Sequence, residues 1–200
     1  MRALDDILRE SSSRHKHVCP RQVLGARMGL YAGALLNLDL SRADKRLLVV
    51  AETDGCTVDG LIAATGCHVG GRTLRIMDLG KVAATFLDVH TEEAIRIVPK
   101  RESRSLALDY VTAARNRWEA MLRGYQIIPA DELFCIQRVR LNVPLAQIIS
   151  QPAIKTECDL CCEEIINGRE VRRSSLVLCR SCAGENYFQL IGMSQPLSWE

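Results

Sequence analysis

Apolar residues recur along the chain with two spacings, and each spacing predicts a kind of element. Repeats of three to four residues favour helices, which are expected at about 2–10, 20–38, 57–64 and 103–123. Short apolar or alternating runs favour strands, which are expected at about 47–52, 73–77, 83–89, 94–98 and 133–141. The polar run 91–93 suits a turn between two of these strands, so the pattern predicts a hairpin or meander.

The helix expected from residue 20 has a marked start and an unusual face. Pro20 is a good first helical residue, which makes Cys19 the capping residue. Gly25, Gly29 and Gly33 recur at every fourth position, as in closely packed helices, including those of membranes. Because the apolar segment is too short to span a bilayer, the pattern favours a smooth face that packs against a neighbour.

Composition and charge narrow the class of protein. With 200 residues, 48% of them hydrophobic and 25% charged, the chain can form a moderate core and a small additional module. A net charge of +2 predicts neither a nucleic acid nor an acidic membrane as partner. The acidic, amphipathic start does not resemble a signal peptide, so we expect a cytoplasmic protein. Because disulfides are rare in that reducing setting, the nine cysteines indicate metal-binding or reactive thiols.

Two cysteine pairs near the end of the chain predict a structural zinc site. Cys158 and Cys161 form one pair, and Cys179 and Cys182 form the other after an interval of 17 residues. Four thiolates at these spacings can bind one tetrahedral zinc ion, although Cys162 is a rival to Cys161. We expect domains at 1–150 and 151–200, because a segment of about fifty residues with few large apolar groups depends on metal for its folding.

The environment of these cysteines indicates a small finger. Gly168 suits a hairpin turn between the pairs, and Ala183–Ile191 suits a short helix after them. Knuckle, hairpin and helix together resemble a treble-clef finger. Residues 151–200 carry five Lys and Arg against seven Asp and Glu, which disfavours nucleic acid and favours a solvated face or a protein partner.

A second group of soft ligands lies in the first third of the chain. His15, His17 and Cys19 alternate, so an extended segment would point them to one side. A cysteine at a helix start has a lowered pKa, and Cys56 has a setting similar to that of Cys19. Cys67 lies in a glycine-rich loop. Each residue alone also fits an ordinary buried thiol or surface imidazole, but together they suggest a metal pocket.

Over about 13–90 these ligands belong to a longer ordered set of residues: His15, His17, Cys19, Pro20, Gly25, Glu52, Thr53, Cys56, Asp59, Thr65, Gly66, Cys67, Gly70, Leu74, Asp78, Gly80 and Lys81. Their order and spacing resemble the FmdE-like family, which is named after formylmethanofuran dehydrogenase. The four-cysteine finger matches a common appendage of that family. The chain departs from the family pattern at Arg21 and His68.

The resemblance implies an α+β core domain, in which we expect a mixed or antiparallel sheet with packed helices, followed by a treble-clef zinc domain. It also implies a homodimer, for which the glycine face offers a surface. It further implies a core pocket of His17, Cys19 and Cys56, with His15 or Cys67, that binds a second metal ion, zinc or iron, with an incomplete shell.

The resemblance does not specify a substrate. It carries Asp59, Asp78 and Lys81 as candidates for orienting or proton-transfer roles. Dehydrogenase chemistry is not supported, because the chain lacks iron–sulfur cysteine spacings and a dinucleotide fingerprint. Two alternatives remain: an accessory or scaffold protein for a molybdenum or tungsten enzyme, with the finger as docking surface, and a nucleic-acid-binding regulator, which the charge disfavours.

Overall fold

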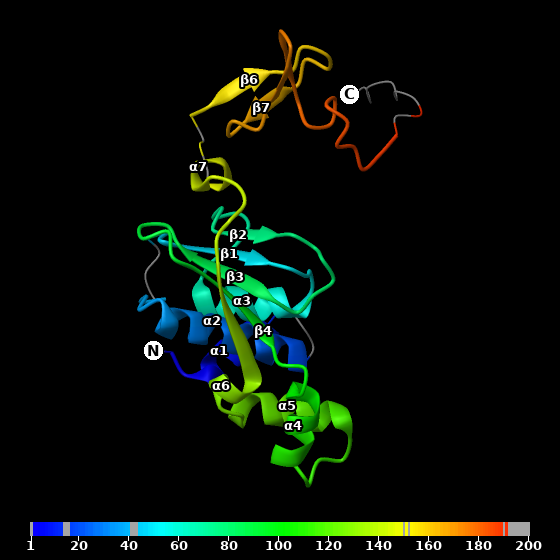
Figure 1. The fold of residues 1–200 in the computed structure, drawn as a ribbon. Coiled ribbons are helices and arrows are strands. Elements are labelled where there is room, and N and C mark those ends of the chain that lie inside the picture. The colour runs from blue at the N-terminus through cyan, green and yellow to red at the C-terminus, as the bar shows by residue number, and fades with distance from the viewer. Residues whose placement is uncertain are drawn as a thin grey trace, which may run out of the picture. The chain divides into compact units, whose positions relative to one another are not determined.

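The computed structural model describes residues 2–13, 17–40, 44–149, 151, 153–189 and 191. The chain divides into two compact units, Met1–Leu145 and Ala146–Glu200, which are coloured from blue to yellow-green and from yellow to red in Figure 1. The boundary expected from the sequence lay at about residue 151. Within the described residues, no helix has the length and apolar content that a membrane crossing requires.

The first unit is built on a five-stranded sheet with the order β2-β1-β3-β4-β5. Its strands are β1 (Leu47–Ala51), β2 (Leu74–Ile76), β3 (Ala84–Asp88), β4 (Ala94–Pro99) and β5 (Phe134–Val139). Only β1 and β2 pair in parallel, whereas the other three pairings are antiparallel. The β3–β4 hairpin and the mixed sheet confirm the α+β prediction.

Three helices precede or follow β1 and supply much of the core. They are α1 (Leu4–Ser12), α2 (Pro20–Leu35) and α3 (Cys56–Thr65). Figure 1 shows α2 and α3 lying together against the sheet, and their buried side chains form one apolar cluster with those of β1, β3 and β4. The proline at the start of α2 lies at the predicted first helical position.

The backbones of α2 and α3 are in direct contact, and this close packing requires a glycine on each helix. A Cβ on Gly25 would lie 2.1 Å from the carbonyl oxygen of Thr57, and one on Gly60 would lie 2.1 Å from that of Gln22. The contacts advance along both helices in the same direction, since Gly29 faces Ala64 further on. The two helices therefore run roughly parallel, and they begin at the same end.

The glycine face of α2 is used inside the chain. Besides the contacts of Gly25 and Gly29 with α3, Gly33 faces the side chain of Leu40, and all three glycines are buried. The predicted close packing against a neighbour is confirmed, and the neighbour is α3. This face is not available to a second copy, so the homodimer remains a prediction without that reason for it.

The single helix expected over 103–123 is wrong, because two helices form there. They are α4 (Ser103–Tyr110) and α5 (Arg117–Ile127). Asn116 starts α5, and its side chain accepts a hydrogen bond of 2.9 Å from the backbone N–H of Glu119. Gly124 then packs against Ala107, where a Cβ would meet that of Ala107 at 2.8 Å. The apolar spacing continues through both helices, which conceals the break.

Short helices flank the last strand of the sheet. Helix α6 (Ala130–Leu133) precedes β5 and includes Leu133, the residue expected to be first in that strand. Helix α7 (Leu145–Ile148) follows the strand. The second unit contains two hairpins, β6 with β7 and β8 with β9. Their bounds are β6 (Lys155–Glu157), β7 (Glu164–Ile166), β8 (Val171–Arg173) and β9 (Leu176–Leu178).

The helix expected over 183–191 does not form in the described residues of that stretch. A single turn follows β9, in which the N–H of Ala183 donates to the carbonyl of Cys179 at 2.9 Å. Gly184 then adopts a φ of 101°, which ends the turn. The knuckle and hairpin of the predicted finger are present without its helix, so the treble clef remains a prediction.

Candidate metal centre and the cysteine cleft

The four predicted finger cysteines meet at one point. The sulfur atoms of Cys158, Cys161, Cys179 and Cys182 all lie within 4.8 Å of one another, and those of Cys161 and Cys179 are 3.9 Å apart. Tetrahedral zinc with bonds of about 2.3 Å places its sulfur ligands about 3.8 Å apart. The geometry therefore fits a structural metal ion such as zinc. Cys162 is not a member of this group.

Backbone N–H groups prepare this cluster for negative charge. The N–H of Cys179 donates to the sulfur of Cys158, and that of Cys182 donates to the sulfur of Cys179, each at 3.3 Å. Hydrogen bonds from the backbone of Cys161 and Cys179 lower the pKa of Cys158 to about 6. A hydrogen bond with the Cys179 side chain raises the pKa of Cys182 to about 12. Four adjacent thiols cannot all ionise unless a cation joins them.

The first unit brings two further cysteines together at the start of two helices. Cys19 precedes Pro20 at the start of α2, and Cys56 is the first residue of α3. Because these helices pack in parallel, both thiols line one open cleft of about 1030 Å³. Burial raises the pKa of Cys56, and the neighbouring Cys19 thiol raises it further. For Cys56 the pKa therefore shifts opposite to the lowering expected at a helix start.

A glutamine fixes the position of Cys19. The backbone N–H of Cys19 donates to Oε1 of Gln22 at 2.7 Å. The fully buried Gln22 amide in turn donates to the carbonyl and the hydroxyl of Ser11, each at 3.1 Å. Gln22 thus ties the end of α1 to the segment that carries Cys19.

The predicted histidines lie beside this cleft or beyond the described residues. The ring of His17 makes an edge contact with Trp118, which lines the cleft, at a centroid distance of 6.1 Å. His15 lies outside the described residues. His17 is therefore near Cys19 in sequence and touches a wall of the cleft, but it does not line the cleft, and among the described residues only the finger cysteines gather at metal-binding distances.

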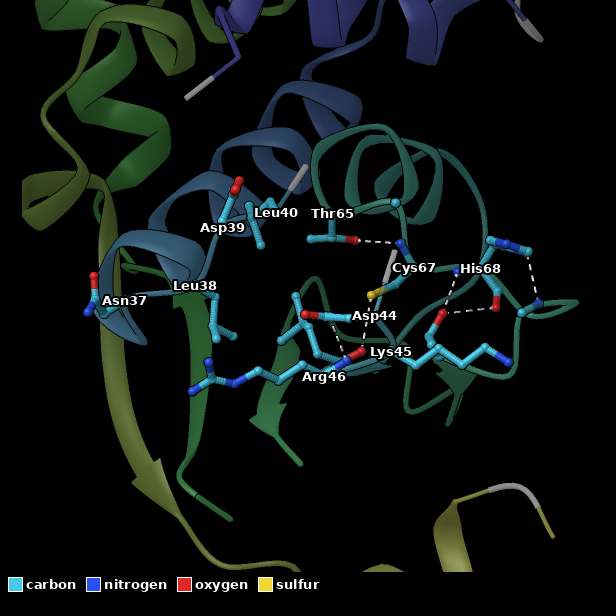
Figure 2. A pocket seen from close by; sticks show the side chains of 14 residues that line it. Asn37, Leu38, Asp39, Leu40, Asp44, Lys45, Arg46, Thr65, Cys67 and His68 are labelled. Carbon is cyan, nitrogen blue, oxygen red and sulfur yellow. Dashed lines mark hydrogen bonds between the residues drawn. The ribbon is translucent and has the colours of Figure 1, made fainter. Parts of the chain in front are cut away.

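Cys67 is not part of this arrangement. It lines a separate cavity of about 330 Å³, which Figure 2 shows together with Thr65 and His68. Its thiol is buried and donates to the carbonyl of Leu47 at 3.4 Å, while its N–H donates to the hydroxyl of Thr65 at 3.1 Å. Burial raises the pKa of Cys67. These contacts are those of a packed structural thiol.

Of the three predicted orienting residues, Lys81 reaches the cleft. The N–H groups of Leu79 and Lys81 donate to the carbonyl of Glu52 at 2.9 and 3.0 Å, which holds this loop at the end of β1. Lys81 lines the cleft beside Cys56. The loop also contains Asp78, whose exposed carboxylate accepts a hydrogen bond of 3.0 Å from the N–H of Gly80 and does not line the cleft.

Asp59 lies one turn after Cys56 on α3. Its negative charge contributes to the raised pKa of Cys56, after burial and the Cys19 thiol. It lines a different cavity of about 50 Å³ beside Ser11 and Ser13. Asp59 therefore influences Cys56 electrostatically without lining the cleft.

The comparisons with known proteins place this arrangement in a family. The model of the family described as "FmdE, Molybdenum formylmethanofuran dehydrogenase operon" matches residues 14–135, more than half of the chain. The chain belongs to the FmdE family. The match includes Cys19, Cys56 and Cys67 but not the four finger cysteines.

Two relatives extend this result. A probable S-adenosyl-L-methionine-binding protein of Archaeoglobus fulgidus is 30% identical over 103 residues, which are 50% of this chain and 28% of that protein. The chain thus spans less than a third of the length of this curated relative. A tungsten formylmethanofuran dehydrogenase FmdE-like protein from Syntrophus aciditrophicus has a solved structure. It matches with a TM-score of 0.57 and 17% identity over 94% of this chain and 96% of that chain, which shows a shared fold.

A partly buried ion pair between Arg96 and Glu52 anchors the residue that follows β1 in this FmdE chain. Arg96 donates two hydrogen bonds to the Glu52 carboxylate, at 2.5 and 2.7 Å. These bonds lower the pKa of Glu52, and the charge of Lys81 adds to the effect. Arg96 therefore holds the carboxylate of Glu52, while the backbone carbonyl of Glu52 holds the loop that carries Lys81.

Sequence reasoning missed the positive charge of the cleft. The cationic side chains that line it are those of Arg21, Lys81, Lys100, Arg101, Arg104 and Arg117. They come from four separate segments, so the nearly neutral net charge gives no sign of them. The one available signal was the run 100–104, which contains three cations but resembles an ordinary solvated helix start.

Proposed function

We propose that this FmdE-like protein binds two metal ions with different roles. The first is a structural zinc ion held by the four finger cysteines. The second is a zinc or iron ion held in the cleft by Cys19, Cys56 and His17. The observation that carries the second site is the meeting of two cysteines from different helices in one open cleft.

The electrostatics of the two thiols support this proposal. Burial and the neighbouring Cys19 side chain resist the ionisation of Cys56, and a divalent cation bound to that thiol offsets this cost. Three protein ligands would leave a coordination position for water or substrate, where a bound ion supplies Lewis-acid chemistry. Lys81 is the cleft cation best held for orienting an anionic substrate group, because its backbone is fixed to Glu52.

A second candidate function is an accessory or scaffold role for a molybdenum or tungsten enzyme. The observation that favours it is an exposed aromatic pair on the finger unit, where Tyr187 and Phe188 are 96% and 53% exposed. Their rings contact each other edge-on at 5.2 Å, which provides an apolar surface for a protein partner. In this role the cleft ion would be delivered rather than used in catalysis.

Cobalt substitution tests the cleft site and its open position. In full-length protein loaded with Co²⁺, the thiolate-to-cobalt absorption should decrease in Cys19→Ser and remain in Cys67→Ser, whose thiol lies in the separate cavity. Added azide should change the cobalt bands of the wild type, because an open position accepts it, while the closed finger site does not respond. Identical spectra of wild type and Cys19→Ser, with no azide response, would contradict the proposal.

A further inference from the structure

The cysteine cleft is a local concentration of positive charge. The whole chain has a net charge of +2, yet six Lys and Arg side chains line this one cleft and no carboxylate of the described residues does. None of the six is paired with an acidic side chain in the ion pairs of the described residues. Apart from Lys81, whose charge also acts on Glu52, these cations are therefore available to a ligand that enters the cleft.

The helices add to this charge. Pro20, Ser103 and Arg117, which begin α2, α4 and α5, line the cleft together with Cys56 at the start of α3. Each helix start carries partial positive charge, where an acidic side chain is stabilising and a cation is not. The first turns of α2 and α4 nevertheless contain no acidic residue.

Cations occupy the starts of α2, α4 and α5 at the cleft, and only α5 also has an acidic residue, Glu119, in its first turn. Arg21 occupies the second position of α2, Arg104 the second position of α4, and Arg117 the first position of α5. This arrangement opposes helix stability in the protein alone, and a bound anion relieves it. Six cations also exceed what one small oxyanion can contact, which indicates a ligand with more than one anionic group.

The apolar part of the cleft indicates an organic ligand. Leu24, Val82, Val98 and Met121 line it, and Trp118 is 45% exposed at its side. A volume of about 1030 Å³ suits a small molecule of cofactor size. A single cleft of this size differs from the extended basic stripe that a nucleic acid follows.

From these observations we infer that the cleft binds a small organic molecule with at least two phosphate or carboxylate groups. Its anionic groups contact the arginines at the helix starts, and its apolar part lies against Met121 and Trp118. The inference deepens the proposed function, on which it rests for the identity of the site, by naming the substrate class.

Calorimetric titration of the full-length, metal-loaded protein tests the inference. Pyrophosphate and citrate are the probes, so that phosphate and carboxylate are compared. The variant Arg21→Gln/Arg117→Gln removes two cleft cations. The control Arg115→Gln/Arg123→Gln removes two cations from the same region that pair with Glu119 and do not line the cleft.

Wild type should bind at least one probe, with an affinity that falls as salt is added. The cleft variant should lose about tenfold or more in affinity, because charge-assisted hydrogen bonds are lost, while the control stays within about twofold. Failure of both probes to bind, an equal loss in the control, or binding of a DNA oligonucleotide in their place overturns the inference.

Metal analysis of the same samples separates this inference from the proposed function. Normal metal content without probe binding overturns the anion inference and leaves the metal site standing. The converse outcome is that the wild type binds a probe while Cys56→Ser has the same metal content as the wild type. This result supports the anion site and shows that Cys56 does not bind a second metal ion.

Discussion

The backbone contact between α2 and α3 makes Gly60 a position at which one added methyl group should disturb the cleft. A Cβ there would lie 2.1 Å from the carbonyl oxygen of Gln22 and 2.7 Å from the backbone nitrogen of Ala26. Ordinary contact begins at 3.4 Å, so the helices must separate by about 1 Å. Overpacking of this kind costs about 1–3 kcal/mol, against about 1 kcal/mol gained from helix propensity.

Because both clashing atoms belong to the backbone, the cost lies at the upper end of this range, and Gly60→Ala should therefore lower the unfolding free energy by about 2 kcal/mol. Gly70→Ala is the matched control, since its nearest neighbour is 3.6 Å away, and it should change stability by less than about 0.5 kcal/mol. Because Gln22 holds the backbone of Cys19, the same displacement should also weaken metal binding in the cleft. Urea denaturation followed by circular dichroism measures the first effect, and metal retention during dialysis measures the second.

The reasoning is refuted if Gly60→Ala matches wild type in both stability and metal retention. In that case the crossing of α2 and α3 tolerates an added methyl group and does not fix the distance between Cys19 and Cys56. Equal destabilisation by Gly60→Ala and Gly70→Ala would also contradict it, since only the former position is crowded.

Three further predictions concern the tail, the core and the assembly. Chelation should unfold the tail alone and allow proteolysis near Lys155, because only the tail depends on metal; simultaneous collapse of the whole chain would show that the domain division is wrong. Glu52 and Asp88 have lowered pKa values, so the stability they add is present at neutral pH and is lost as pH falls below about 5. Urea titrations from pH 7 to pH 3 should show this loss, reduced in Asp88→Asn; equal pH profiles would exclude that contribution. Light scattering should find a dimer of 22.3 kDa chains, and a monomer at all concentrations would remove the homodimer.

Local signals in the sequence predicted the elements that hold the cysteines. Pro20 marked the start of α2, and the regular glycines marked a face for close packing, although they did not reveal that α3 was the neighbour. The paired spacing of Cys179 and Cys182 with the earlier pair was enough to predict their cluster. In these cases the determining interaction is encoded within a few residues or by a fixed spacing.

Features that depend on tertiary contacts could not be predicted from the sequence. The break between α4 and α5 depends on capping by Asn116 and on the contact between Gly124 and Ala107, while the apolar period continues unchanged. Cys67 and Cys56 both belong to the set of residues that carries the family resemblance, but the fold places Cys67 in a different cavity. The cations of the cleft come from segments distant in sequence, and only the fold brings them together.

The number of metal ions per chain tests the central claim most directly. Elemental analysis of purified full-length protein should find two ions in wild type and in Cys67→Ser, whose thiol is packed in a separate cavity. Cys56→Ser should keep the core folded and retain one ion, that of the finger, whereas Cys179→Ser should lose the finger ion and retain that of the cleft. A single ion in wild type that is unchanged in Cys56→Ser would show that the cysteine cleft is not a metal site.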